Sequence, residues 1–130
     1  EQGRGWQEGG VVMLSERGGR VGSKSGKIGA DYFYRRNILY KYEKPLYLKG
    51  YGTVYPDFTF LSKKIGKEIY WEHEGMVDKQ EYARSAVRKI ESYQKNDIYP
   101  GDRLILTFET EQSILNSKTI EGLVNRYLQF

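Results

Sequence analysis

Two acidic residues, Asp57 and Glu72, lie in neighbouring stretches of aromatic and β-branched residues that are typical of β-strands. The segment 63–66 separates these stretches and suits a hairpin turn, because its glycine tolerates unusual backbone angles. If Ser62 pairs with Lys67 across the turn, the same register places Asp57 opposite Glu72. Opposed side chains of an antiparallel pair have Cβ atoms roughly 5 Å apart, so two carboxylates there repel each other. A shared proton, a neighbouring cation or a divalent metal would offset that repulsion.

This chemistry depends on the register, because a slip of one residue would put the two acids on opposite faces of the sheet. The alternative interpretation is a hydrated sheet face that carries both carboxylates. The residues around the two acids favour a buried setting instead. They are Pro56, Phe58, Phe60, Ile69 and Trp71. We therefore favour a metal site.

The composition is typical of one soluble globular domain, since 38% of the 130 residues are hydrophobic and 29% are charged. Cysteine is absent, which excludes disulfides and thiolate metal sites and favours a reducing compartment, the cytoplasm. No apolar run approaches the roughly 20 residues that cross a bilayer, so we expect no membrane partner. The formal net charge of +4 permits a nucleic-acid partner. The chain opens at Glu1 without a methionine, as a piece of a longer polypeptide would.

Hydrophobic periodicity predicts a mixed α/β fold. Residues 1–22 are rich in glycine and indicate an N-terminal arm or linker, which leaves 23–130 as the folded domain. The predicted elements are a helix over 23–37, a strand region over 38–48, the hairpin within 54–75, a helix over 78–96, a strand over 103–110 and a helix over 119–128. Because the last strand follows a long helix, we expect it to run parallel to a strand already in the sheet.

Several residues mark the ends of these elements. Ser23 or Ser25 is suited to cap the first helix, and Asp78 followed by Glu81 matches a capping pattern for the second. Pro45 favours an edge position or a break within the first strand region, because proline cannot donate a ladder hydrogen bond.

The helix predicted over 78–96 has an apolar stripe and an opposite basic side that includes Arg84 and Arg88. A solvated helix face is the simpler interpretation of that side. The other interpretation is a row of cations along a phosphate backbone. With Lys79 in the first turn, these residues are our candidates for nucleic-acid binding.

The order of elements, with Pro-Asp at the start of one hairpin strand and Glu near the end of the next, resembles the PD-(D/E)XK nuclease superfamily. The resemblance rests on Tyr-Pro-Asp-Phe at 55–58 and Ile-Tyr-Trp-Glu-His-Glu-Gly-Met at 69–76. It implies a restriction-endonuclease-like αβββαβ core with a C-terminal helix. It also implies that Asp57 and Glu72 hold Mg²⁺ or Mn²⁺ against the scissile phosphate, with the backbone carbonyl of His73 completing the metal shell. Such a metal lowers the pKa of a bound water.

The family pattern has a lysine two residues after the glutamate, where it orients or deprotonates the attacking water, but this chain has Glu74 there. Some related domains have this lysine on the following helix. Our candidate is Lys89, because it lies on one side of the predicted helix with Tyr82 and Tyr93, and Lys79 in the first turn is the second choice. A solvated surface lysine is the alternative interpretation of either residue.

The family pattern also has a glutamate on the first helix, which this chain lacks. Gly26 and Gly29 occupy that region, and Asp31 is the only acid nearby. The two glycines mark either close packing or the missing side chain. The chain could therefore have the family's fold with slow or absent cleavage.

The sequence thus predicts a Mg²⁺- or Mn²⁺-dependent hydrolase, an endonuclease or exonuclease acting on DNA in preference to RNA, with Asp57, Glu72 and Lys89 as the catalytic set. The main alternative is a catalytically weakened nuclease-fold module that binds nucleic acid or serves assembly within a larger protein. A small protein-interaction domain is the third interpretation. A homodimer also stays open, because two nuclease protomers are needed to cut both strands at once. His73 points away from both acids by strand alternation, which predicts a packed or surface side chain.

Overall fold

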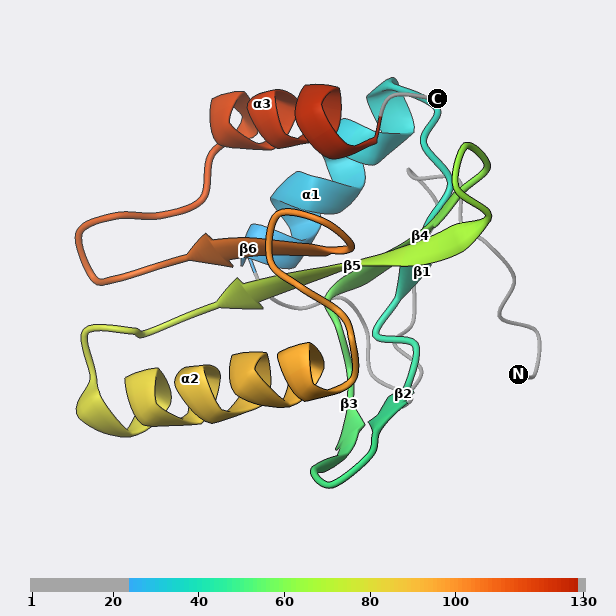
Figure 1. Ribbon diagram of the computed structural model, residues 1–130. Helices are drawn as coiled ribbons and strands as arrows, with labels where there is room; N and C mark the ends of the chain where they lie inside the picture. Colours follow the sequence, from blue (N-terminus) through green and yellow to red (C-terminus); the bar gives the residue numbers. More distant parts are fainter. Residues whose placement is uncertain (1–23, 129–130) are drawn as a thin grey trace.

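The computed structural model describes residues 24–128 (Figure 1). The helices of this part are α1 (Lys24–Arg35), α2 (Gln80–Lys95) and α3 (Ser117–Tyr127). The strands are β1 (Lys41–Tyr42), β2 (Leu46–Leu48), β3 (Gly52–Val54), β4 (Phe58–Ser62), β5 (Lys67–Glu74) and β6 (Leu104–Phe108). No helix within 24–128 has the length and apolar character that crossing a bilayer requires. The glycine-rich arm predicted over 1–22, like Ser23, lies outside the described residues.

Four strands form a mixed sheet in the order β1-β4-β5-β6, and β2 and β3 form a small separate antiparallel sheet. β6 runs parallel to β5, as the long helix between them predicted. Figure 1 shows α1 and α3 over one face of the mixed sheet and α2 across the other face. The predicted mixed α/β class with a C-terminal helix is therefore confirmed.

Each face of the sheet buries its own apolar core. On the face under α1 and α3, the ring of Phe33 packs edge to face against Phe58, Phe60 and Trp71 at centroid distances of 4.9, 5.1 and 5.7 Å. On the other face, Tyr93 of α2 is fully buried among residues of β5 and β6. The strands β5 and β6 are thus enclosed by helices on both sides.

The hairpin of β4 and β5 has the predicted register, with Ser62 opposite Lys67. The paired residues end with Phe58 opposite Trp71, so Asp57 lies in a bend just before β4, one step beyond the ladder in which it was predicted to face Glu72. Its carboxylate is still near enough to Glu72 for its charge to raise the pKa of that residue.

The strand region predicted over 38–48 is broken at Pro45, where the sequence allowed a break. Its two halves belong to different sheets, since β1 pairs with β4 and β2 pairs with β3. The turn after β2 is tied to the end of α2, because the backbone N–H of Lys49 donates to Asn96 Oδ1 and Asn96 Nδ2 donates to the Lys49 carbonyl. The small sheet is therefore fixed against α2.

Of the predicted helix caps, those by Asp78 and Ser25 are not formed, and the alternative cap Ser23 lies outside the described residues. The N-cap of α2 is Lys79, which makes no capping hydrogen bond with its side chain, and Asp78 instead accepts from the backbone N–H of Glu111 at 3.2 Å. Ser25 lies within α1, and its hydroxyl donates to Glu109 rather than accepting from the helix backbone. In both cases the polar side chain that the local pattern predicted as a cap instead makes a hydrogen bond to a residue far away in the sequence.

We predict that Gly29→Ala lowers the free energy of unfolding by about 1–2 kcal/mol. The added Cβ would lie 2.9 Å from two ring carbons of Phe58, which is buried in the aromatic core. Overpacking costs about 1–3 kcal/mol, which outweighs the ~1 kcal/mol that alanine gains over glycine in a helix. Gly29 thus marks close packing.

The matched control is Gly122→Ala in α3, where an added Cβ meets nothing within 4 Å. This variant should gain up to about 1 kcal/mol from helix propensity alone. Urea denaturation of both variants measures the difference. Equal stabilisation by the two substitutions would contradict the close packing at Gly29.

Candidate active site

Glu72 is buried on the face of β5 covered by α2, and two side chains of that helix donate to its carboxylate. Lys89 Nζ lies 3.0 Å from Oε1, and the hydroxyl of Tyr93 lies 2.7 Å from Oε2. Burial raises the pKa of Glu72 to about 7 against the opposing effects of Lys89 and Tyr93, and the nearby charge of Asp57 adds to the rise. Glu72 is therefore balanced between its charged and neutral forms near neutral pH.

Lys89 bridges two carboxylates of β5, because its Nζ also lies 3.1 Å from Glu74 Oε2. Burial alone would lower the pKa of Lys89, but the charges of Glu72 and Glu74 outweigh it and raise the pKa. The ammonium group is therefore charged at neutral pH. The lysine that contacts Glu72 therefore comes from α2. The position two residues after Glu72, where the family pattern has its lysine, is occupied by Glu74. With a side chain only 23% exposed, Lys89 is not a solvated surface lysine.

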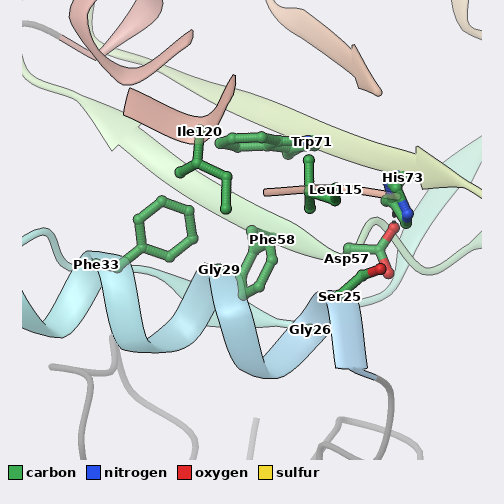
Figure 2. A pocket seen from close by; sticks show the side chains of 10 residues that line it. All are labelled: Ser25, Gly26, Gly29, Phe33, Asp57, Phe58, Trp71, His73, Leu115 and Ile120. Carbon is green, nitrogen blue, oxygen red and sulfur yellow. Dashed lines mark hydrogen bonds between the residues drawn. The ribbon is translucent and has the colours of Figure 1, made fainter. Parts of the chain in front are cut away.

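Asp57 lies immediately before β4, where its Oδ2 accepts a 2.7 Å hydrogen bond from the backbone N–H of His73. Burial raises the pKa of Asp57 to about 6, although this hydrogen bond opposes the rise. Figure 2 shows the carboxylate at the polar end of a small pocket, beside Ser25 and His73, with apolar side chains lining the rest. The pocket has a volume of about 10 Å³, which is room for one water.

The ring of His73 lies on the opposite face of β5 from Glu72, as strand alternation predicted. Its Nδ1 lies 2.7 Å from Thr107 Oγ1, and its Nε2 lies 2.9 Å from Glu109 Oε1. Ser25 Oγ donates to the same oxygen of Glu109 over 2.8 Å. The hydrogen bonds from His73 and then Ser25 lower the pKa of Glu109. This network joins α1 to the ends of β5 and β6, so it fixes the strand segment whose N–H holds Asp57.

The donor atoms of the site fit a hard divalent cation. Among the residues that the structure describes, no three acidic, histidine or cysteine side chains form a group that could hold a metal ion. Mg²⁺, however, is commonly held by one or two carboxylates together with water and substrate phosphates. Each oxygen of Glu72 accepts one hydrogen bond and keeps a second acceptor site. The charge of Lys89 lowers the pKa of both Asp57 and Glu72 and the charge of Glu74 raises both, so these four groups act on one another electrostatically.

The basic residues predicted to bind nucleic acid lie on the surface of α2 and at its N-cap. Lys79, Arg84 and Arg88 are all exposed. This exposure suits a solvated face and a phosphate-binding row equally well, so their role stays a prediction. Lys89, and not Lys79, is the lysine that contacts Glu72. Ligation by the His73 carbonyl also stays a prediction.

The first helix brings a glycine, rather than an acid, to the pocket beside Asp57. Gly26 lines that pocket, together with Gly29. Asp31 is exposed on α1, and its charge acts on Tyr40, whose pKa is raised by burial and then by Asp31. Asp31 therefore does not take the place of the glutamate that the family pattern has on this helix.

Some residues of the site were not predicted for their observed roles. Tyr93 belongs to the apolar stripe of α2, yet its spacing of four residues from Lys89 puts both on one helix face, which is the signal that pairs them. Glu109 follows the last strand in a segment with no pattern of its own. Its contact with His73 depends on the parallel pairing of β5 with β6, which the sequence indicates only in direction and not in register.

Comparison with models of known families, with curated proteins and with solved structures found no match for the chain. The chemistry of the site is therefore inferred from its own residues. These are two buried acids whose pKa values are raised and a charged lysine that contacts one of them.

We predict that the metal-free protein loses stability as the pH rises from about 4 to about 7. Burial raises the pKa of Asp57 from 3.8 to about 6 and that of Glu72 from 4.5 to about 7. In this window the folded protein binds protons that the unfolded chain has released, so the free energy of unfolding falls with rising pH, by on the order of 2–3 kcal/mol for each group. Urea denaturation in EDTA across this range measures the slope.

The control for this prediction is the double variant Asp57→Asn, Glu72→Gln, whose amides do not titrate. Its stability should change much less between pH 4 and pH 7 than that of the wild-type protein. A wild-type stability that rises steadily through the window would contradict the burial of the two acids.

Proposed function

We propose that the protein is a metal-dependent nuclease that hydrolyses phosphodiester bonds in nucleic acid, with DNA preferred to RNA. The observation that carries the proposal is the 3.0 Å contact between Lys89 Nζ and Glu72, whose carboxylate is electrostatically coupled to that of Asp57. Two acids can hold a divalent ion that activates water, and a lysine can stabilise the charge that develops on a phosphate. Here the lysine comes from α2 instead of β5.

Both acids are held in fixed positions by hydrogen bonds, which supports their use as ligands. Asp57 is held by the His73 N–H, and Glu72 is held by Lys89 and Tyr93. Preset ligands avoid the free-energy cost of ordering them when an ion or a substrate arrives. Mg²⁺ or Mn²⁺, when bound, would supply a water of lowered pKa and neutralise charge on the phosphate.

Lys89 acts in this proposal as a hydrogen-bond donor and a fixed positive charge. Its pKa is raised by Glu72 and Glu74, so it holds its proton at neutral pH and is a poor general base. A protonated lysine beside the scissile phosphate stabilises the negative charge that develops on the phosphate oxygens. The charge of Lys89 also neutralises part of the negative charge of Glu72 and Glu74 before an ion binds.

The test is a cleavage assay on end-labelled single-stranded DNA, duplex DNA and RNA, with Mg²⁺, Mn²⁺ or EDTA. We expect cleavage with either ion and none with EDTA. Salt-sensitive binding without cleavage under every ion tested would contradict the proposal. That outcome would instead favour the alternative of a weakened module that only binds nucleic acid.

A further inference from the structure

A cleft of about 290 Å³ opens beside the candidate active site, between α2 and the turn that joins β2 to β3. Tyr51 of the turn and Tyr82 of α2 line it, and so do Glu74 and Lys89, the ion pair described above. Small-molecule sites start near ~300 Å³, so the cleft suits one flat ring system and is too small for a base pair or a helix.

The aromatic side chains of the cleft are exposed. Tyr51 is 39% exposed and Tyr82 is 53% exposed, and Met76, two residues after β5, is 46% exposed. Exposed aromatic rings from two separate elements that line one cleft are typical of surfaces on which nucleobases stack. Met76 also has a positive φ of 55°, a conformation that non-glycine residues adopt rarely and that is enriched at ligand sites.

The turn that carries Tyr51 is fixed relative to α2. The two hydrogen bonds between Lys49 and Asn96 tie it to the C-terminal end of the helix, and the backbone N–H of Tyr51 donates to the Leu48 carbonyl over 3.0 Å. The two aromatic walls are therefore held by the fold and do not depend on a ligand for their spacing.

Glu74 offers the cleft a carboxylate oxygen beside Lys89. The residue is only 7% exposed, and its Oε2 lies 3.1 Å from Lys89 Nζ, although among the described residues no donor makes a hydrogen bond of regular geometry to this oxygen. A carboxylate oxygen has two acceptor positions, so the ion pair with Lys89 leaves room for a ligand that donates an N–H group. The exocyclic amino group of cytosine is such a donor, and glutamate accepts from it in known recognition chemistry.

We infer that the cleft binds one unpaired nucleobase, stacked against Tyr82 and Tyr51, with an exocyclic amino group donating to Glu74. A paired base cannot bind in this way, because its amino group and both of its faces are already engaged in the duplex. The inference rests on the proposed action on nucleic acid and narrows it to single-stranded substrates. Lys89 joins the two sites, since it lines the cleft and contacts Glu72.

The test measures binding in EDTA by fluorescence anisotropy of labelled oligo(dC), oligo(dT) and a dC·dG duplex. We expect the protein to bind oligo(dC) at least severalfold more tightly than the other two. Tyr82→Ala should weaken binding of oligo(dC) by about tenfold, and Tyr82→Phe should keep it, because the ring provides the stacking. Glu74→Gln should remove the preference for oligo(dC) over oligo(dT). The control is Tyr99→Ala, an exposed tyrosine that does not line the cleft.

Equal affinity of the wild-type protein for oligo(dC) and the duplex, or for oligo(dC) and oligo(dT), would overturn the inference. So would a Tyr82→Ala variant that binds oligo(dC) as tightly as the wild-type protein. The binding measurements need no metal, so they are independent of cleavage. A protein that cuts nucleic acid but fails this test has no base-binding cleft, and one that passes but does not cut is not a nuclease.

Discussion

Replacing Asp57 with asparagine, or Glu72 with glutamine, is expected to lower metal-dependent cleavage by at least about a thousandfold, a loss of roughly 4 kcal/mol of transition-state stabilisation. An amide has no negative charge with which to hold a divalent ion. Cleavage of labelled DNA under single-turnover conditions, over a range of Mn²⁺ concentrations, measures the loss.

The two variants should fold, because each amide can replace the hydrogen bonds of the acid. The amide of the Asp57→Asn variant keeps a carbonyl oxygen that can accept from the His73 N–H. The amide of the Glu72→Gln variant can accept from Lys89 while its NH₂ donates to the hydroxyl of Tyr93. The matched control is Glu91→Gln, an exposed acid on α2, which should cut at the wild-type rate. A folded Asp57→Asn variant with undiminished cleavage would exclude this site as the seat of the reaction.

Replacing Lys89 with methionine is expected to lower the free energy of unfolding by about 3–5 kcal/mol at pH 8 and by much less at pH 5. Methionine keeps most of the apolar stem but leaves the carboxylates of Glu72 and Glu74 buried without a counter-charge, and breaking a buried ion pair on one side carries a penalty of that size. At pH 5 Glu72, whose pKa is raised by burial, takes up a proton and the penalty shrinks.

The same substitution should lower the cleavage rate by about a hundredfold at saturating Mn²⁺, the size expected for one well-placed polar group in a transition state. Urea denaturation at both pH values and single-turnover cleavage measure the two effects. Lys95→Met is the control, because Lys95 is a lysine on the same helix that makes no ion pair with Glu72 or Glu74, and its loss should change stability by no more than about 0.5 kcal/mol. Equal stability of Lys89→Met and wild-type protein at pH 8 would contradict the ion pairs.

The sequence predicted the strand pairing at the centre of the site because several local signals agree there. The turn at 63–66 and the aromatic strands on either side favour pairing of Ser62 with Lys67, the register that we assumed and that the structure has. That register brings the bend that carries Asp57 beside the end of β5, where Asp57 accepts from the His73 N–H, and strand alternation puts the ring of His73 on the other face from Glu72. Lys89 was chosen as the candidate lysine from the family resemblance and from its helical spacing with Tyr82 and Tyr93. The structure adds the contacts of Lys89 with Glu72 and Glu74.

The parts that the sequence did not predict depend on contacts between residues far apart in the chain. Asp78 and Ser25 match local capping patterns, but each bonds to the segment after β6, at Glu111 and Glu109. Propensity for a cap is worth about 1 kcal/mol, and a tertiary hydrogen bond of similar strength can replace it. The cleft beside Glu74 could not be predicted from the sequence either, because Tyr51 and Tyr82 line one cleft only through the packing of the small sheet against α2.

The location of Mn²⁺ in crystals of the protein soaked with that ion, found by its anomalous scattering, tests the joint use of Asp57 and Glu72 most directly. We predict one ion in contact with a carboxylate oxygen of each residue, and no ion there in crystals of Asp57→Asn. Manganese bound elsewhere in the wild-type protein, or a wild-type site without manganese at saturating concentration, would contradict the proposed nuclease.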